Sequence, residues 1–300
     1  MTVQAEQRTR VLAEEPMRPA GPVKGFTAGT VETVRDLWAH RELLDLLIRR
    51  ELKARYKDST LGFFWSLMRP LTMLLIYYVA VGQFLGAARD VKGFAIYIFA
   101  GLTAWNLFNE LVASGTQSIV SNSGLVKKVY LPREIFPLST AGSALFNFAI
   151  QLAILVAAIL VTGAAPSAQN ALYFPLAFAV LLVFGLALAL VLSAVNVYLR
   201  DVQYLIEIAL MVLFWASPIV YSWTAVRDAV GSVVTEIYLA NPMTLVVLGF
   251  QRAFWAEGAD TPVPSDLSLR LCIALAVGSL LLWVAQRVFT RLQGNFAQEL

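Results

Sequence analysis

Long uninterrupted apolar runs constrain the fold of this chain more than any other feature. Leu152–Val161 and Leu176–Leu192 consist almost entirely of aliphatic and aromatic residues. A helix rises about 1.5 Å per residue and the hydrocarbon core of a bilayer is about 30 Å thick, so roughly 20 apolar residues cross it. In the whole chain 58% of the residues are hydrophobic and 14% are charged, whereas a soluble domain carries about 45–50% and about 25%. We therefore predict an all-α integral membrane protein.

Six runs are long and apolar enough to be transmembrane helices: 63–85, 94–114, 135–161, 171–196, 204–221 and 267–288. A seventh candidate, 237–255, is interrupted by Asn241 and Pro242. Proline removes a backbone donor and clashes with the preceding turn. Non-helical backbone at membrane depth is tolerated only where protein or a water-filled cavity surrounds it. We interpret this stretch as a re-entrant or interfacial hairpin between the fifth and sixth spans, with a seventh full span as the alternative.

The placement of basic residues predicts the orientation. Six spans put both termini on one side, and the cytoplasmic loops of membrane proteins collect Lys and Arg. Sixteen Lys and Arg residues fall in 1–62, 121–134, 197–203 and 289–300, and four fall in the connections on the other side. Both termini of this multi-pass protein are therefore predicted to be cytoplasmic. The net charge of +3 is too small to indicate nucleic-acid binding.

The chain before the first span divides into two parts. Residues 1–30 contain Pro, Gly, Glu and Arg but no apolar run, which predicts a disordered cytoplasmic tail. Residues 31–60 carry apolar side chains at helical spacing: Val34, Leu37, Trp38, Leu44, Leu47 and Ile48. Such a helix can lie in the membrane interface with its apolar face toward the acyl chains, and packing on a soluble partner is the alternative. Residues 61–295 form the predicted six-span domain.

The sequence offers little that an active site or a metal centre would need. One cysteine, Cys272, and one histidine, His40, exclude a Cys- or His-rich metal cluster. We interpret Glu110, Asn147 and Gln151 inside the spans as contacts between helices. No GxxxxGK[ST] phosphate loop occurs, so any ATP use has to come from another polypeptide, and we predict no catalytic residue and no cofactor here. A membrane enzyme remains an alternative that would have to use scattered loop carboxylates: Asp228, Glu236, Glu257, Asp260 and Asp266.

Aromatic side chains are frequent in and beside the predicted spans. Flat rings give large contact areas at a small cost in conformational entropy, and Tyr and Trp add a polar group. These properties suit a passage along which an amphiphilic sugar chain slides. The candidates for such a lining are Trp65, Tyr77, Trp105, Phe108 and Trp215. The alternative is a belt of aromatic residues at the membrane surface.

Two short connections predicted to be cytoplasmic could receive a push from a soluble motor. The first, "SNSGLVKKVYLPREIFP" (121–137), begins with a break and continues as a short amphipathic turn that Pro132 ends. The second is "NVYLRDVQY" (196–204), with Arg200 and Asp201 at its middle. Ordinary tight loops with an excess of positive charge are the alternative.

Three segments carry a resemblance to a known family. They are "LLIRRELKARYKDSTLGFFWSLMRPL" (46–71), "GLVKKVYLPREIFP" (124–137) and "NPMT" (241–244). With them the chain resembles the type-two ABC export permeases, and within these the exporters of O-antigen, teichoic acid and mycobacterial galactan. The resemblance covers roughly 31–295. It implies a homodimer in the bacterial plasma membrane that binds two separate ATPase subunits, on which ATP and Mg act.

The resemblance also implies site residues and a cargo. ATPase coupling is expected at Lys127, Lys128, Tyr130, Leu131, Pro132, Arg133, Tyr198, Arg200 and Asp201. The cargo of these exporters is a polysaccharide on a polyprenyl diphosphate, moved from the cytoplasm to the outer side. Because that headgroup is anionic, we hypothesise that Arg69, with Arg55 or Lys57, receives it; anchoring of the first span is the alternative role. Another lipid or drug as cargo, or an enzyme acting on lipid-linked sugars, is the alternative function.

Overall fold

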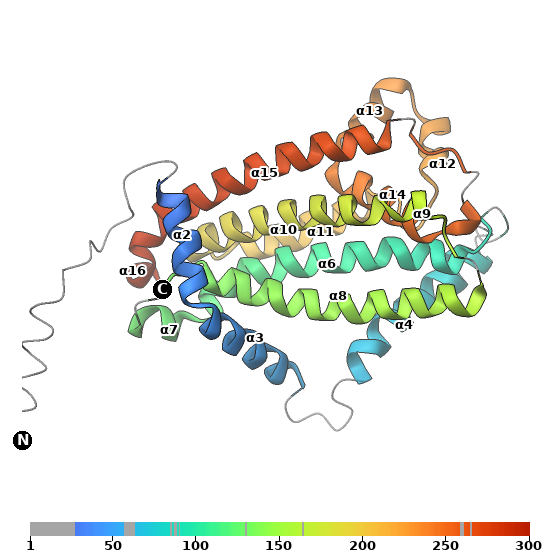
Figure 1. Cartoon of the computed structure of the whole chain (residues 1–300). Coiled ribbons are helices and arrows are strands. Elements are labelled where there is room, and N and C mark those ends of the chain that lie inside the picture. The colour runs from blue at the N-terminus through green and yellow to red at the C-terminus, as the bar shows by residue number, and fades with distance from the viewer. Residues whose placement is uncertain are drawn as a thin grey trace, which may run out of the picture.

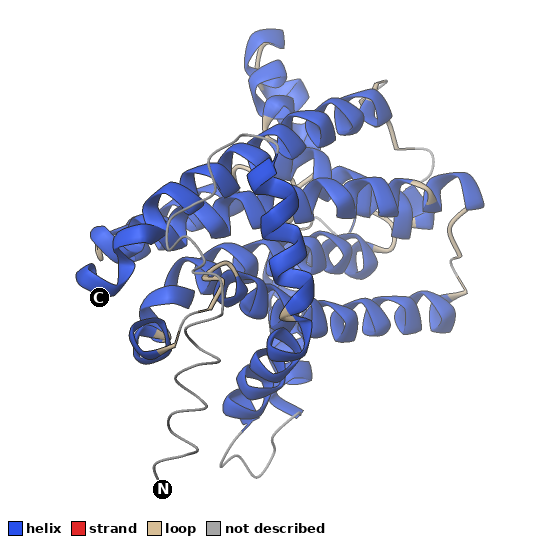
Figure 2. Cartoon of the chain, turned by 60° about the vertical axis from the view of Figure 1, so that its left-hand side comes forward, coloured by secondary structure: helices blue, strands red, loops and turns tan. Residues whose placement is uncertain are grey.

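The structure is a computed structural model of the 300-residue chain. It describes all residues except 1–27, 57–63, 85, 87, 88, 90, 130, 164, 259, 260 and 265. Every regular element among the described residues is a helix, and no strand occurs among them (Figure 2). The predicted all-α class is therefore confirmed.

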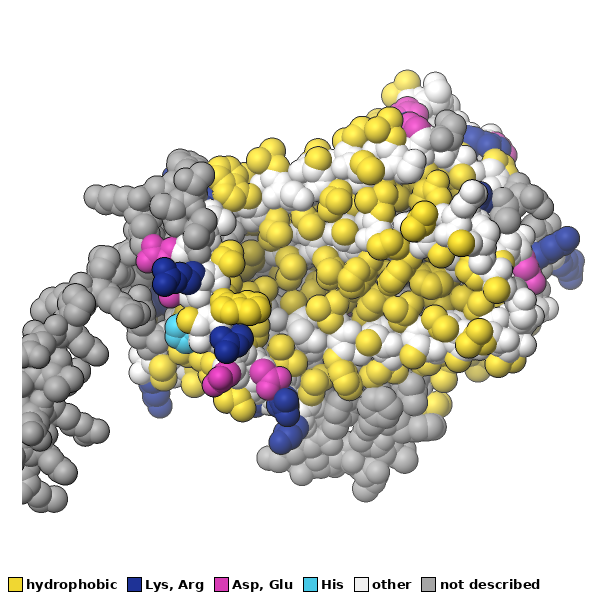
Figure 3. Space-filling view, viewed as in Figure 1, with side chains coloured by type: hydrophobic (Ala, Val, Ile, Leu, Met, Phe, Trp, Pro, Cys, Tyr) yellow, Lys and Arg dark blue, Asp and Glu magenta, His cyan; other side chains and the backbone are white. Residues whose placement is uncertain are grey.

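Four long helices run side by side and form the body of the molecule: α6 (Phe94–Ser121), α8 (Ile135–Thr162), α10 (Tyr173–Tyr198) and α15 (Leu267–Leu292) (Figure 1). All four are long and apolar enough to cross a membrane, if the short helix α9 (Ala168–Ala171) is counted with α10. They correspond to the predicted second, third, fourth and sixth spans. Figure 3 shows apolar side chains along the middle of this body and charged side chains toward its two ends, as expected of a multi-pass membrane protein.

Two shorter helices correspond to the other predicted spans. α4 (Phe64–Tyr77) continues without interruption into the π-helix η1 (Tyr78–Phe84), and the apolar part of this stretch is Pro70–Phe84. α11 (Val202–Trp215) has 14 residues, which rise about 21 Å and fall short of a full hydrocarbon core. The predicted limits of the fifth span, 204–221, were wrong at the second end. Residues 216–221 are not helical, because Pro218 supplies no backbone N–H and disfavours helical geometry in the residue before it.

The predicted break at Asn241 is present. α13 (Ser232–Ala240) and α14 (Pro242–Phe254) meet at a bend of 83°. Pro242 is the first residue of α14, and the Asn241 side chain accepts a hydrogen bond from the backbone N–H of Met243 at 2.9 Å. Asparagine as the N-cap followed by proline is a standard helix start. The helix α12 (Trp223–Ala229) and the 3-10 turn η2 (Ala256–Gly258) flank this hairpin.

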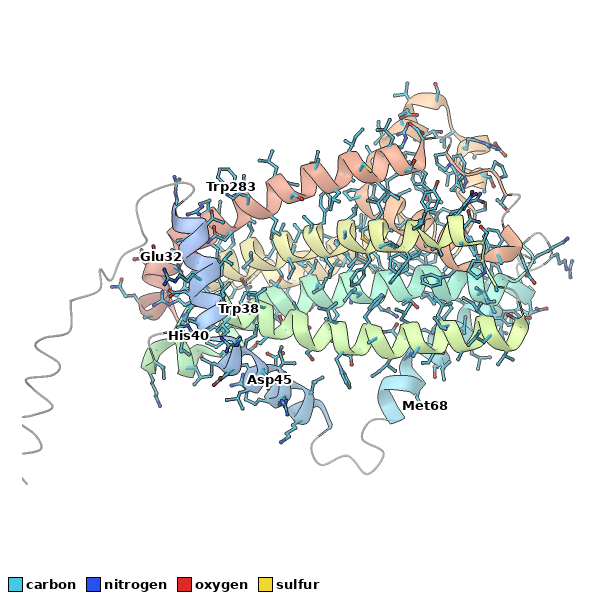
Figure 4. All side chains as sticks on the ribbon, viewed as in Figure 1. Glu32, Trp38, His40, Asp45, Met68 and Trp283 are labelled. Carbon is cyan, nitrogen blue, oxygen red and sulfur yellow. The ribbon has the colours of Figure 1, made fainter. Side chains whose placement is uncertain are left out.

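The helical stretch before the first span is broken at His40 into α2 (Ala28–Ala39) and α3 (Arg41–Tyr56) (Figure 4). Its apolar side chains do not all point the same way. Leu47 is buried against the bundle, whereas Trp38 is 71% exposed. The expected continuous amphipathic helix is thus two helices, and most of its apolar residues contact protein. The chain ends with η3 (Gln293–Asn295) and α16 (Phe296–Glu299), which lie at the same end of the bundle as α2 and α7 (Ser123–Lys128) (Figure 1).

α6 occupies the centre of the bundle, with 78% of its apolar window buried. Glycines let it approach α10 closely. A Cβ atom added to Gly115 would lie 2.6 Å from the Cβ of Ala189, and one added to Gly185 would lie 2.7 Å from Leu111. Small residues at a helix crossing are the usual basis of close packing between helices in membranes. The centre of the fold is therefore a tight α6–α10 pair.

Candidate functional site

The first predicted coupling loop forms a short amphipathic helix at one end of the bundle. α7 follows a turn at Asn122, and the backbone becomes extended at Val129. Its Val126 side chain is buried in an apolar cluster, whereas Lys127 and Lys128 are exposed. The amphipathic turn that the sequence predicts is present, with its basic side open to a partner.

The rest of this loop turns inward. Leu131 and Pro132 are half-buried, and Tyr130 lies outside the described residues. The guanidinium of Arg133 lies over the ring of Phe296, 5.7 Å from the ring centre. Glu134 is 4% exposed. Burial raises the pKa of the Glu134 carboxyl above its ordinary value, and the charge of Asp36 raises it further.

The second predicted loop lies beside the first. Tyr198 ends α10, and its hydroxyl donates a hydrogen bond to the Leu292 carbonyl at 2.7 Å. Arg200 and Asp201 are exposed in the following turn. Side chains from both loops, including Val126 and Tyr198, pack in one apolar cluster with the end of α15. The structure thus brings the two loops together on one surface, which we call the loop surface (123–129, 131–133 and 198–201).

α3 is attached to the same end of the bundle. The Ile48 side chain fills the space beside Gly142 of α8, where an added Cβ would lie 2.4 Å from it. The Ser139 hydroxyl donates to Glu51 at 2.9 Å, and Arg50 donates to Asn122, the residue before α7. A hydrogen bond thus joins α3 to the residue that precedes α7.

The three headgroup candidates cannot all be placed. Arg55 lies in the last turn of α3 and Arg69 lies in α4, but their side chains are outside what the structure describes. Lys57 lies outside the described residues altogether. That these cations receive an anionic headgroup stays a prediction.

Three of the five aromatic candidates lie around one ring that the sequence reasoning missed, and a fourth contacts one of these three. Phe214 lies 5.9 Å from Tyr77, 5.4 Å from Trp105 and 5.5 Å from Trp215, and Trp105 lies 6.0 Å from Phe108. Trp105 and Phe108 are buried, whereas Trp215 is 57% exposed. The Trp65 side chain lies outside the described part. Within one chain, these rings pack α4, α6 and α11 against one another. Their role in lining a passage stays a prediction.

Polar side chains form a ladder between α6 and α8. Asn106 donates to Gln151 at 2.8 Å, and Asn147 donates to both carboxylate oxygens of Glu110 at 2.9 and 3.1 Å. The partners on each helix are four residues apart and share a face. The predicted role of these polar groups as contacts between helices is confirmed.

At the opposite end of the bundle, side chains donate to three carbonyls of the non-helical segment 216–221. Tyr97 donates to the Tyr221 carbonyl at 2.7 Å and to the Pro218 carbonyl at 3.3 Å. Gln251 donates to the same Pro218 carbonyl at 2.8 Å, and Asn241 donates to the Ala216 carbonyl at 3.3 Å. We call this arrangement the carbonyl clamp. It explains how a non-helical segment survives here, because unpaired carbonyls are costly away from water.

Beside the clamp lies a small hollow of about 20 Å³, lined in part by Tyr97, Trp223 and Trp255. Its indole N–H groups donate to backbone carbonyls, Trp223 to Pro262 and Trp255 to Lys92, both at 2.7 Å. Three of the carboxylates that a membrane enzyme would need are paired with arginine instead: Asp228 with Arg227, and Glu236 and Asp266 with Arg270. Among the described residues no cluster of His, Cys, Asp and Glu could hold a metal ion.

Comparison with known proteins identifies the family. The ABC-2 type transporter family matches residues 42–255. The chain belongs to this family. It is 30% identical to the O-antigen export system permease protein RfbA of Myxococcus xanthus, over 90% of this chain and 100% of that protein. It is 24% identical to a Klebsiella pneumoniae protein of the same name, over 86% and 94%, and 23% identical to the Escherichia coli polysialic acid transport protein KpsM, over 68% and 78%.

The family assignment confirms the predicted resemblance and makes this ABC-2 type protein a transport component rather than an enzyme. The matched region contains both parts of the loop surface and all three headgroup candidates. Phe296, whose ring lies under the Arg133 guanidinium, is outside the matched region. Phe296 and the donors of the clamp were not found from the sequence, because their roles depend on contacts between separate segments. The acceptors of Tyr97, and the Arg133 guanidinium over the Phe296 ring, lie more than 90 residues away in the sequence. The partners of Gln251 and Asn241 lie 33 and 25 residues away.

Proposed function

We propose that this chain is the membrane permease of an ATP-driven exporter that moves a polyprenyl-diphosphate-linked polysaccharide from the cytoplasm to the outer side of a bacterial plasma membrane. The observation that carries the proposal is the full-length similarity to a protein named as an O-antigen export permease, of which this chain covers 100%. A second named relative transports polysialic acid. Both cargoes are long hydrophilic polymers.

In the proposed arrangement the chain has six spans, with α4–η1 as the first and α11 as the fifth, and both termini in the cytoplasm. The α13–α14 pair re-enters from the outer side. The excess of Lys and Arg in the segments at the α7 end supports this orientation. The single cysteine makes the test direct, since Cys272 replaced by Ser leaves a background for new cysteines. Labelling of Lys127→Cys by an impermeant reagent in intact cells would contradict the orientation.

The motor is a separate ATPase subunit, and two permeases bind two such subunits. The loop surface is the proposed contact, because Lys127 and Lys128 are exposed. Its Leu125, Val126 and Tyr198 side chains pack in the apolar cluster of the bundle and hold it in place. The passage lies between the two permease copies. The hollow described in one chain, about 20 Å³, has room for little more than a water molecule and cannot enclose a polymer.

Depletion of the protein tests the cargo. A lipid-linked polysaccharide should accumulate inside the cell, and its reducing end should carry the polyprenyl diphosphate. Accumulation of a small lipid, or sensitivity to a drug without any glycan defect, would contradict the proposed cargo. For the headgroup hypothesis, Arg69→Gln should reduce export at normal expression and topology; unchanged export would reject it, leaving Arg69 as an anchor of the first span.

A further inference from the structure

The C-terminal turn places one buried ring where three segments meet. Phe296 begins α16, four residues before the chain ends, and its side chain has 0% exposure. Its ring lies 6.1 Å from Tyr198 and 5.7 Å from Phe289, and the Arg133 guanidinium lies 5.7 Å from its centre. The ring therefore touches both parts of the loop surface and the last turn of α15.

The burial of this turn needs a cause outside the turn itself. Short helices are marginal in water, and α16 has only four residues, so contacts outside it must hold it in place. One such contact is the hydrogen bond that the Tyr198 hydroxyl donates to the Leu292 carbonyl at 2.7 Å, just before the turn. Phe296 and Phe289 then pack in the apolar cluster that also holds Val126 of α7. The end of the chain is thus part of the core under the loop surface.

The basic residues of the loop surface have different surroundings. Lys127 and Lys128 are exposed and are available to a partner. Arg133 instead turns onto the Phe296 ring, where a cation over an aromatic face is attractive. Arg133 thus connects the loop surface to Phe296, whose ring in turn packs on Phe289 of α15.

We propose that Phe296 is a positioning residue of the coupling apparatus, through which displacement of the two loops by the ATPase moves α15. This rests on the proposed function, in which the loops bind the ATPase. α15 contacts α10 and α14 along its length, so its movement reaches the α13–α14 hairpin at the far end. α16 is then a part of the transmission between the loop surface and α15.

The native cysteine provides the reporter. Cys272 is exposed near the first residue of α15, at the end opposite Phe296, so a spin label placed there reports on α15 without an added residue. The permease is purified as a complex with its ATPase subunit, and the label's spectrum is compared without nucleotide and with ATP and vanadate. Hydrolysis of ATP is measured on the same samples. The variants are Phe296→Ala, Phe296→Leu, which keeps apolar volume but removes the ring, and Gln298→Ala, an exposed control in the same turn.

We expect the wild type and Gln298→Ala to show a nucleotide-dependent change at Cys272. Phe296→Ala should reduce that change at least fivefold while ATP hydrolysis and co-purification stay within twofold of wild type. Phe296→Leu should restore part of the change, because it refills the cluster. The double variant Arg133→Ala with Phe296→Ala should lose no more of the nucleotide-dependent change at Cys272 than the more affected single variant, since both substitutions act through one contact.

A full response of Phe296→Ala, or of Phe296→Leu if the alanine variant does not fold, would overturn the inference. So would a label spectrum in the wild-type complex that stays the same with and without nucleotide. Failure of any ATPase subunit to bind or hydrolyse ATP with the wild-type permease would instead reject the proposed function. The two failures are distinguishable because hydrolysis and binding are measured separately from the label.

Discussion

Removing one hydroxyl from the carbonyl clamp should destabilise the protein measurably. Tyr97→Phe deletes the donor to the Tyr221 carbonyl at 2.7 Å and the weaker one to the Pro218 carbonyl at 3.3 Å. Leaving a buried acceptor without its donor costs about 1–3 kcal/mol, so we expect a loss of about 2 kcal/mol. Gln251→Met removes the other Pro218 donor, but Tyr97 still reaches that oxygen, so the loss should be about 1 kcal/mol.

The double variant carries the decisive information. It strips the Pro218 carbonyl of both donors, and neither hydrogen bond can then compensate for the other. Coupling between groups that share a partner is about 0.5–3 kcal/mol. The combined loss should therefore be about 4 kcal/mol, beyond the sum of the two single losses.

Unfolding in mixed micelles with increasing SDS, followed by tryptophan fluorescence, measures these free energies. Tyr204→Phe is the matched control, because Tyr204 is 59% exposed on α11 and its loss should be within about 0.5 kcal/mol. Additive losses within that margin would refute the shared-acceptor geometry. A Tyr97→Phe loss no larger than the control's would refute the clamp itself.

Three further changes test the packing and the polar groups. Gly115→Ala should destabilise by about 1–3 kcal/mol in the same unfolding assay, because its methyl group enters the close contact between α6 and α10. Glu110→Leu should cost about 1–3 kcal/mol by leaving Asn147 without its acceptor, whereas Glu110→Gln should cost less because its amide can pair with that side chain. Glu134→Gln should be more stable than wild type at neutral pH, and the difference should vanish below about pH 4, which unfolding at several pH values measures.

The physical reason for the last effect is the raised pKa of Glu134, whose ordinary value is 4.5. The folded protein keeps the proton to higher pH than the unfolded chain does, so the free energy of unfolding falls as the pH rises above 4.5. A constant difference in stability between the two proteins across pH would contradict this reason.

For Gly115→Ala, the control is Gly124→Ala in α7, where an added Cβ meets nothing within 4 Å. Equal losses of stability for the two variants would contradict the packing argument. Equal losses for both Glu110 variants would contradict the pairing with Asn147.

The sequence predicted well those features that a local pattern determines. Hydropathy located the four long helices, and the Asn241–Pro242 pair located the bend because the cap and the missing donor act within one turn. Hydropathy also led to the error in the fifth span. Ile219 and Val220 are almost fully buried although they are not helical, and an apolar pattern reports burial rather than backbone conformation.

The parts of the site that sequence reasoning missed depend on which helix faces meet. Phe214 is one aromatic residue among many until the fold places it between Tyr77 and Trp105. In the same way, the apolar spacing of 31–60 predicted one face, but the break at His40 sends its side chains in different directions. No periodicity within a segment carries that information.

The glycine seam between α6 and α10 limits how the transporter can change shape. With backbones this close at Gly115 and Gly185, turning either helix about its axis would drive a larger side chain into its neighbour. Rotation of the two against each other is thereby blocked, and the pair behaves as a strut. Conformational work then falls to the lightly anchored helices at the periphery, such as α11, of which only Leu210 and Phe214 are buried.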